Sequence, residues 1–339
     1  MRLKSGLVAL GLCAALAGCG YVAEHTAPKK QPASARTAPS YKADELLWSA
    51  LHSSEYDQIP AAMEAQTGAY LENPNDAVTA AHVGLLHIWR VSERSRMVEV
   101  PATITDDVTL ARKYFEEAVE LSPNNGRYLG FLATATLAEG QIHHDEHITR
   151  RGYFLLLDAI KAWPEFNLFV GGYLMSSQPA DSERFKQALE WQWQTLDVCA
   201  GAKVDRRTVN YSQYLSRESR VGPNGACWNS ENAPHNMEGF FLNMGDMLVK
   251  SGDWQTARKV YADAKLSPSY SGWPYAQVLE ERLRDAQANV AVFNSPLANG
   301  APARVNVPLG SDSPPGSAAS APRQILAASA ISYAVCHRR

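Results

Sequence analysis

The chain has 339 residues, of which 45% are hydrophobic and 20% are charged, and its net charge at pH 7 is −3. This length fits two ordinary domains or one elongated domain, and it is sufficient to bury a core. The balanced charge excludes a strongly basic nucleic-acid-binding protein, so no nucleic-acid partner is expected. The hydrophobic content excludes disorder throughout the chain. No complete nucleotide-binding, hydrolase or zinc-protease motif is present, so the sequence is more informative about location and architecture than about chemistry.

Residues 1–18 are expected to form an export signal. Arg2 and Lys4 supply its positive start, and the apolar run that follows is too short to cross a bilayer of ~30 Å. This run ends in Leu-Ala-Gly-Cys, with the cysteine at position 19. These four residues resemble the lipobox of bacterial lipoproteins, which implies that Cys19 is acylated and becomes the first residue of the mature chain. The alternative is an ordinary secretory signal followed by a chance cysteine.

The residue after Cys19 bears on the destination of the protein. In lipoproteins of this kind an aspartate at that place favours the inner membrane, whereas this chain has Gly20. The resemblance therefore implies anchoring at the periplasmic face of the outer membrane, through several acyl chains that give a stable attachment. Residues 19–42 are rich in proline, alanine and serine, and they are expected to be a flexible tether.

Three cysteines remain once the signal and the lipidated residue are set aside, at positions 199, 227 and 336. In an oxidising periplasm the nearer pair, Cys199 and Cys227, is expected to form a disulfide across an irregular loop. Free thiols are the alternative. The role of Cys336 is left open.

An internal repeat is the strongest structural signal in the sequence. Three blocks share the offsets 0, 4, 7 and 12, and a fourth has its proline one place early. The blocks are Ala62-Gln66-Ala69-Pro74, Ala111-Phe115-Ala118-Pro123, Gly152-Leu156-Ala159-Pro164 and Ala257-Tyr261-Ala264-Pro268. The first three positions lie on one helical face, and the proline ends the helix. Small residues 12 positions upstream, Ala50 and Gly245, indicate that each block is the second helix of a pair.

This unit resembles the tetratricopeptide repeat, in which small residues let paired helices approach closely. Gly245, Ala257, Tyr261 and Ala264 give the best match. The resemblance covers about residues 43–283. It implies that residues 43–293 form an all-α solenoid of antiparallel helix pairs with inserted loops, whose groove binds a protein or peptide. Another class of helical repeat is the alternative. Residues 294–339 are rich in proline, alanine and serine, so they are expected to be disordered.

The repeat pattern is weak between Pro164 and Phe240. A helix is expected over residues 181–198, but its partner near 166–177 lacks the small residue at the expected place. Trp191 and Trp193 cannot share one helical face, so one is expected in the core and the other nearer the rim. A capping helix with many charges is expected over residues 273–293.

A histidine-rich insertion of seven residues lies in the third repeat, at His143-His144-Asp145-Glu146-His147. If this stretch is helical, His143 and His147 face the same side one turn apart, a spacing that can hold Zn or Cu. A third ligand would have to come from another repeat. The alternative is a polar loop whose acidic residues favour the start of the next helix.

A second cluster of residues that could bind a ligand or transfer a proton precedes the block that best matches the repeat. We consider Trp228, His235, Asn236 and Glu238 as a partner-binding pocket, in which His235 and Glu238 could act as acid and base. The structural alternative is a disulfide-pinned loop in which Trp228 fills the groove edge and Asn236 caps the following helix.

The function expected from these observations is not enzymatic, and no catalytic residue is assigned. We expect a membrane-anchored periplasmic scaffold that binds an envelope protein or peptide. The alternative is a periplasmic metal-binding or hydrolytic module that uses the histidine-rich insertion or the loop from Trp228 to Glu238.

Overall fold

The structure is a computed structural model that describes residue 22 and residues 26–52, 56–92, 99–217, 222–229 and 235–295. Within these ranges every regular element is a helix, so the predicted all-α class is confirmed. The signal, Cys19 and residues 296–339 with Cys336 lie outside the described residues.

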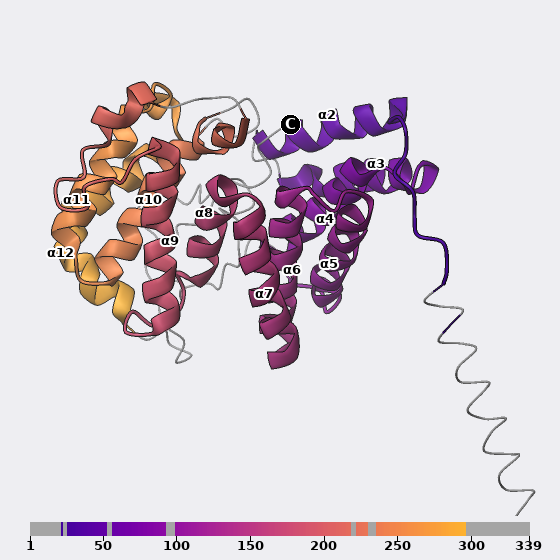
Figure 1. Ribbon diagram of the computed structural model, residues 1–339, viewed down its shortest axis with the longest axis horizontal. Coiled ribbons are helices and arrows are strands. Elements are labelled where there is room, and N and C mark those ends of the chain that lie inside the picture. Colours follow the sequence, from indigo (N-terminus) through magenta and orange to yellow (C-terminus); the bar gives the residue numbers. More distant parts are fainter. Residues whose placement is uncertain are drawn as a thin grey trace, which may run out of the picture.

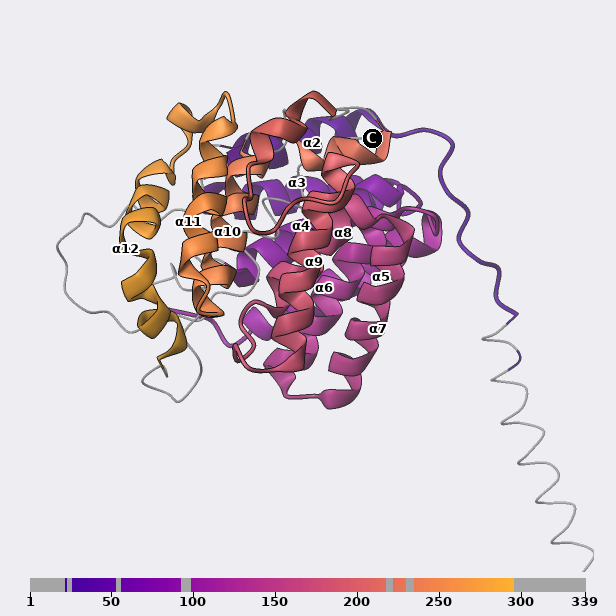
Figure 2. The ribbon, with the colours of Figure 1, turned by 60° about the vertical axis from the view of Figure 1, so that its left-hand side comes forward.

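The helices pack in pairs that are adjacent along the chain. The pairs are α2 (Ala38–His52) with α3 (Ile59–Glu72), α4 (Ala77–Ser92) with α5 (Ile104–Leu121), α6 (Gly126–His143) with α7 (Glu146–Ala162), α8 (Pro164–Met175) with α9 (Glu183–Ala200), and α10 (Asn236–Lys250) with α11 (Trp254–Asp263). The last helix, α12 (Ala276–Asn294), covers α10 and α11. Figure 1 shows α2–α5 on one side of the molecule and α10–α12 on the other, with α8 and α9 between them, and Figure 2 shows α10–α12 side by side at one edge.

Short 3-10 helices connect or extend these pairs. They are η1 (Tyr56–Gln58), η3 (Tyr211–Arg217), η4 (Gly222–Cys227), η5 (Ala264–Leu266) and η6 (Tyr270–Gly272).

The positions that define the repeat are points where paired helices approach each other closely. A Cβ atom added to Gly245 would stand 2.2 Å from Cε1 of Tyr261, and one added to Gly84 would stand 3.0 Å from the Phe115 ring. The alanines of the repeat blocks are all buried: Ala62, Ala69, Ala111, Ala118, Ala159, Ala257 and Ala264. Small residues are therefore required here because a larger side chain has no space between the paired helices.

The first helix of several pairs is buried on nearly every side. In α10 every residue except Gly239 is buried, and α8 is buried from Phe166 to Tyr173. Their partners, such as α7 and α11, keep an exposed polar face. The first helices therefore offer few side chains to a partner, which differs from the open groove that the repeat predicts.

The stretch with the weak repeat pattern still forms a helix pair, α8 with α9. Its close approach uses Gly171 and Gly172, which lie against Trp191 and Gln192. The small residues are thus present but displaced along α8, which explains why the fixed offsets missed them. Trp191 and Trp193 are both 6% exposed, so the expected division into one core and one rim residue is wrong. The guanidinium of Arg206 lies over the Trp193 ring, 5.4 Å from its centroid, and so covers the second indole.

The helical domain begins earlier than the sequence predicts. Helix α2 starts at Ala38 rather than at residue 43. Before it, Lys30 forms an ion pair of 2.8 Å with Glu117, and the Ala33 amide donates to the carbonyl of Asn75. The part of the expected tether that follows residue 30 is therefore attached to the helices rather than free.

The buried side chains form two adjoining hydrophobic cores. One centres on α2–α6 and the other on α7–α12, and Leu155 and Leu174 pack against both. In the described part of the chain no helix has the length and apolarity needed to cross a bilayer.

Candidate functional site

A pocket of about 450 Å³ opens beside the first turn of α10. Five apolar side chains and two polar ones line it: Leu215, Trp228, Met237, Leu266 and Pro268, with Asn229 and Ser269. These residues come from η3, the loop after η4, α10, and the segment that follows α11. A pocket of this size and lining suits an apolar group of a ligand or a partner side chain.

Three contacts hold the loop that carries Trp228. Cys199 at the end of α9 and Cys227 at the end of η4 form a disulfide, as the sequence predicts. The Trp163 indole donates to the carbonyl of Pro223 over 3.0 Å, and the Asn236 amide donates to the carbonyl of Ala226 over 2.8 Å. Trp228 is therefore held in place against the start of α10 rather than carried by a free loop.

A polar cluster lies behind the pocket wall, around the fully buried carboxylate of Glu238. One oxygen accepts hydrogen bonds from the hydroxyls of Ser267 (2.7 Å) and Ser269 (3.0 Å), and the other accepts from the amide of Asn229 (2.8 Å). Nδ1 of His235 donates to the same carboxylate over 3.2 Å. Ser269 and Asn229 thus connect the buried charge to the pocket surface.

These contacts decide the charge of Glu238. Burial alone would raise its pKa, but the hydrogen bonds from His235, Ser267 and Asn229 outweigh burial and lower the pKa below its usual range. Glu238 is therefore ionised at neutral pH. Because both serine hydroxyls donate to the carboxylate and not to the histidine, these residues do not form a serine nucleophile paired with a base. The arrangement holds a negative charge and does not activate a hydroxyl.

Another buried carboxyl group joins α11 to η3, the element that supplies Leu215 to the pocket. Asp263, at the end of α11, accepts a hydrogen bond of 3.2 Å from the Tyr211 amide at the start of η3. Burial raises the pKa of Asp263 to about 7, against the opposing effect of this hydrogen bond. Part of the Asp263 population is thus protonated near neutral pH.

The structure brings together the four residues that the sequence suggests as a pocket, but it gives them different roles. Trp228 lines the pocket, and His235 and Glu238 lie in the cluster behind it. Asn236 is not the cap of α10, because it is already the first helical residue and its side-chain amide donates to the carbonyls of Ala226 and Trp228. Asn229 does this capping instead, since its Oδ1 accepts from the Met237 amide over 2.8 Å.

The sequence reasoning missed most of the pocket lining. Leu215, Leu266, Pro268 and Ser269 lie on separate segments, and no motif connects them with Trp228. Asn229 and Met237 are the sequence neighbours of Trp228 and Asn236. Their closeness to these predicted residues is the only indication of the pocket lining in the sequence.

The two histidines suggested as metal ligands lie on different helices. His144 adopts a left-handed conformation (φ 54°), which ends α6 at His143. Asp145 caps α7 by accepting from the amides of His147 and Ile148, which is the structural alternative considered for this insertion. The stretch is not one continuous helix, so the condition under which His143 and His147 would share a helical face is not met. Within the described ranges, no group of three or more His, Cys, Asp or Glu side chains is placed to hold a metal ion.

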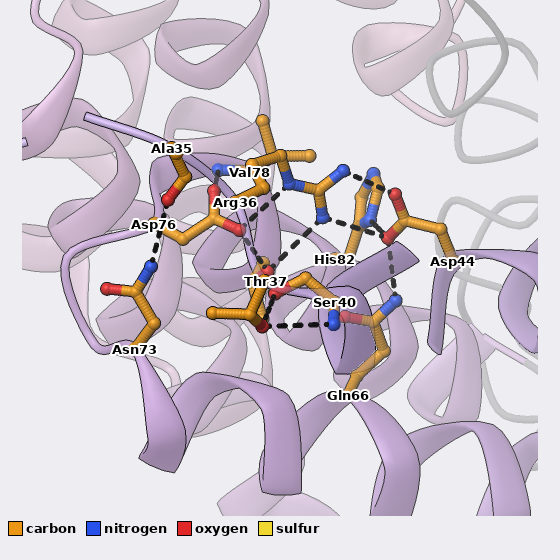
Figure 3. Close-up of polar contacts among 11 residues, drawn as sticks. Ala35, Arg36, Thr37, Ser40, Asp44, Gln66, Asn73, Asp76, Val78 and His82 are labelled. Carbon is orange, nitrogen blue, oxygen red and sulfur yellow. Dashed lines mark hydrogen bonds and ion pairs between the residues drawn. The ribbon is translucent and has the colours of Figure 1, made fainter. Parts of the chain in front are cut away.

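A second polar network lies at the other side of the fold, where Arg36 joins the N-terminal segment to α2 and α4 (Figure 3). Arg36 forms ion pairs with Asp44 (2.7 Å) and with Asp76 (2.9 Å). Nδ1 of His82 lies 2.6 Å from Asp44, and the Gln66 amide donates to the same carboxylate over 3.0 Å. Asp76 also caps α4 by accepting from the Val78 amide.

This network is an anchor and not a reaction centre. Asp44 is 1% exposed and His82 is 7% exposed, so a substrate has no access to them. Burial alone would raise the pKa of Asp44, but hydrogen bonds from His82 and Arg36 hold it well below its usual range. The charged carboxylates thus fix Arg36, and with it the segment before α2.

No protein-family model, curated protein or solved structure matches the chain in the three comparisons made.

Proposed function

We propose that the chain is a lipid-anchored scaffold of tetratricopeptide-like repeats that binds a partner of the cell envelope. In this proposal the lipid on Cys19 places the protein at the periplasmic face of the outer membrane. The pocket beside α10 receives an apolar side chain of a protein or peptide partner.

The observation that carries the proposal is the apolar pocket with a polar edge. Trp228 and Met237 are of the residue types that are enriched in binding surfaces, and the disulfide holds the loop of Trp228 before any partner arrives. A preformed pocket lowers the entropy cost of binding. The dense hydrogen bonding of Glu238 supports binding rather than catalysis, because the carboxylate already has its donors.

Repeat-like packing supports the architectural part of the proposal. The small residues at the repeat offsets are buried, and Gly245 lies directly against Tyr261, as the tetratricopeptide resemblance requires. Stacked helix pairs of this kind are rigid platforms for partner binding.

The test compares two leucine variants of the full-length protein in cells. Leu215→Asp places a charge at the pocket, and Leu110→Asp places the same charge at an exposed leucine of α5. After crosslinking, partners of the native protein should be retained by Leu110→Asp and reduced at least about tenfold with Leu215→Asp, since a buried unpaired charge costs more than 1.4 kcal/mol. Equal capture by both variants would show that the pocket does not bind the partner. Circular dichroism and thermal unfolding confirm that both variants are folded.

A further inference from the structure

The residues that line the pocket determine which kind of chain segment can bind there. The lining is apolar, while the donors of Asn229 and Ser269 are directed inward at Glu238. An ionised carboxylate lies directly behind these two side chains, so the potential in the pocket favours a positive group. The best occupant is therefore a short apolar segment flanked by basic residues.

One segment of this chain has that composition. Residues 323–339 contain an apolar run that includes Ile325, Leu326, Ile331, Tyr333 and Val335. Arg323 precedes this run, and His337, Arg338 and Arg339 follow it, while no acidic residue lies among residues 323–339.

The charges of the two parts of the chain are also complementary. Residues 38–295 contain 23 basic and 33 acidic residues, a net charge of −10, whereas residues 296–339 contain four arginines and one aspartate, a net charge of +3. Attraction between opposite net charges raises the rate at which such segments meet.

The chain has enough length to reach the pocket. Helix α12 ends beside the last turn of α10, where the Asn294 amide donates to the Lys250 carbonyl. The pocket lies at the opposite end of α10, which at 15 residues is roughly 22 Å long. The 29 residues between Ser295 and Ile325 can cover up to ~96 Å when extended.

We propose that residues 323–339 dock in the pocket formed by Leu215, Trp228, Met237, Leu266 and Pro268 and so act as an internal ligand. The apolar run fills the pocket, and the terminal arginines lie toward Ser269 and Asn229 in front of Glu238. This inference rests on the proposed function only for its consequence, which is that an external partner must displace this segment.

A photocrosslinking experiment on the full-length protein tests the docking directly. The photoreactive amino acid p-benzoylphenylalanine replaces Tyr333 in one variant and Val305, outside the proposed segment, in a control. Irradiation should join position 333 to peptides that contain Trp228, Met237 or Leu266, with a yield at least fivefold above that from position 305. Crosslinks from position 333 to other parts of the surface, or equal yields at the two positions, would overturn the proposal.

A competition experiment measures the same contact by affinity. The probe is a synthetic peptide of residues 320–339 with Ser in place of Cys336. The full-length double variant Ile331→Asp, Val335→Asp should bind this peptide at least about tenfold more tightly than the native chain, because an attached ligand competes at a high effective concentration. The control variant Val305→Asp, Val307→Asp should behave as the native chain does. Equal affinity for all three chains would contradict the docking.

The two proposals fail in different ways. If position 333 crosslinks to the pocket but Leu215→Asp retains the envelope partner, the docking stands and the partner-binding function is wrong. If Leu215→Asp loses the partner and position 333 does not reach the pocket, the function stands and the docking is wrong.

Discussion

Glycine at position 245 shows how one missing side chain sets the distance between two helices. An added Cβ would meet three atoms of the Tyr261 ring at 2.2–2.8 Å, and the ring is fixed by a hydrogen bond of 2.6 Å from its hydroxyl to Asp246. We expect Gly245→Ala to lower the free energy of unfolding by about 1–3 kcal/mol, the usual cost of overpacking a core. Urea denaturation followed by circular dichroism measures this change.

The same helix offers a matched control. Gly239 also lies in α10, but a Cβ atom added there would meet nothing within 4 Å. Gly239→Ala should leave stability unchanged or raise it by up to about 1 kcal/mol, because alanine favours a helix more than glycine does. Similar destabilisation at both positions would mean that the contact with Tyr261 is not the cause.

The second prediction at this scale concerns the pH dependence of Asp263. Its pKa is raised from 3.8 to about 7, so the folded state binds more protons than the unfolded state between these values. Stability from this group is therefore present at low pH and is lost as the pH rises through 7. Asp263→Asn should raise the free energy of unfolding at pH 8 by about 1–3 kcal/mol, since it removes a buried charge while keeping an acceptor for the Tyr211 amide.

The comparison of the native protein with Asp263→Asn isolates this effect. Asp246 also has a raised pKa, of about 6, through burial, and it contributes a dependence of the same sign in both proteins. The stability difference between the two proteins should shrink from pH 8 to pH 5. A difference that stays constant over this interval would show that Asp263 does not titrate there.

At the residue scale the sequence predicts contacts between near neighbours in a repeat. Ala257, Tyr261 and Ala264 are predicted as packing residues because their spacing places them on one helical face, and all three are buried. The burial of Trp193 is not predictable in this way, because Arg206 covers it from a loop. Leu46 stands four residues before Ala50, the spacing of one helical face, yet it is 44% exposed, and the buried side chain is that of its neighbour Leu47.

The disulfide belongs to the scale of elements, since it fixes η4 to α9. We expect Cys227→Ser to lower the free energy of unfolding by about 3 kcal/mol, the value typical for closing a loop of this length. The helical signal should remain, because α2–α7 pack with their own neighbours. Urea denaturation gives the stability, and mass spectrometry of non-reduced peptides shows the linkage.

Cys336→Ser is the control for this variant and should leave stability unchanged. A peptide that links Cys336 to Cys199 or Cys227 in the exported protein would contradict the pairing.

Element boundaries show why helix ends are hard to predict. The insertion in the third repeat extends α6 and α7 and adds a tight turn at His144 and Asp145. A residue other than glycine is uncommon in the left-handed conformation, so a helix end at His144 is not expected from the local sequence. In contrast, Pro164 correctly marks a helix boundary because proline lacks the amide hydrogen that a helix interior needs.

The prediction at the scale of the whole molecule concerns the lipid anchor. If Cys19 carries the proposed lipid, Cys19→Ser should block acylation, and the protein should then leave the outer-membrane fraction or remain unprocessed. Membrane fractionation with intact-mass measurement tests this outcome. A variant that keeps both the mature mass and the outer-membrane fraction would show that the anchor lies elsewhere, and Cys336→Ser serves as the control.

The pocket could not be predicted from single residues or from single helices. Leu215, Trp228 and Leu266 meet only because η3, η4 and η5 converge beside the start of α10. Irregular segments carry no periodic pattern, and their paths depend on single contacts such as the one between Asp263 and the Tyr211 amide. The sequence predicts the paired helices because their packing pattern repeats, and the pocket has no such repeat.

The contacts that begin at Lys30 have a consequence for how far the helical domain can lie from the bilayer. If Cys19 carries the proposed lipid, a tether that ended at residue 42 would span up to ~76 Å, at ~3.3 Å per extended residue. The chain instead meets the helices at Lys30, which pairs with Glu117, and again at Arg36, which pairs with Asp44 and Asp76. The first of these contacts lies 11 residues after Cys19, and this length spans at most ~36 Å. In this proposal the helical domain stays close to the membrane surface, so its partners must be able to approach that surface.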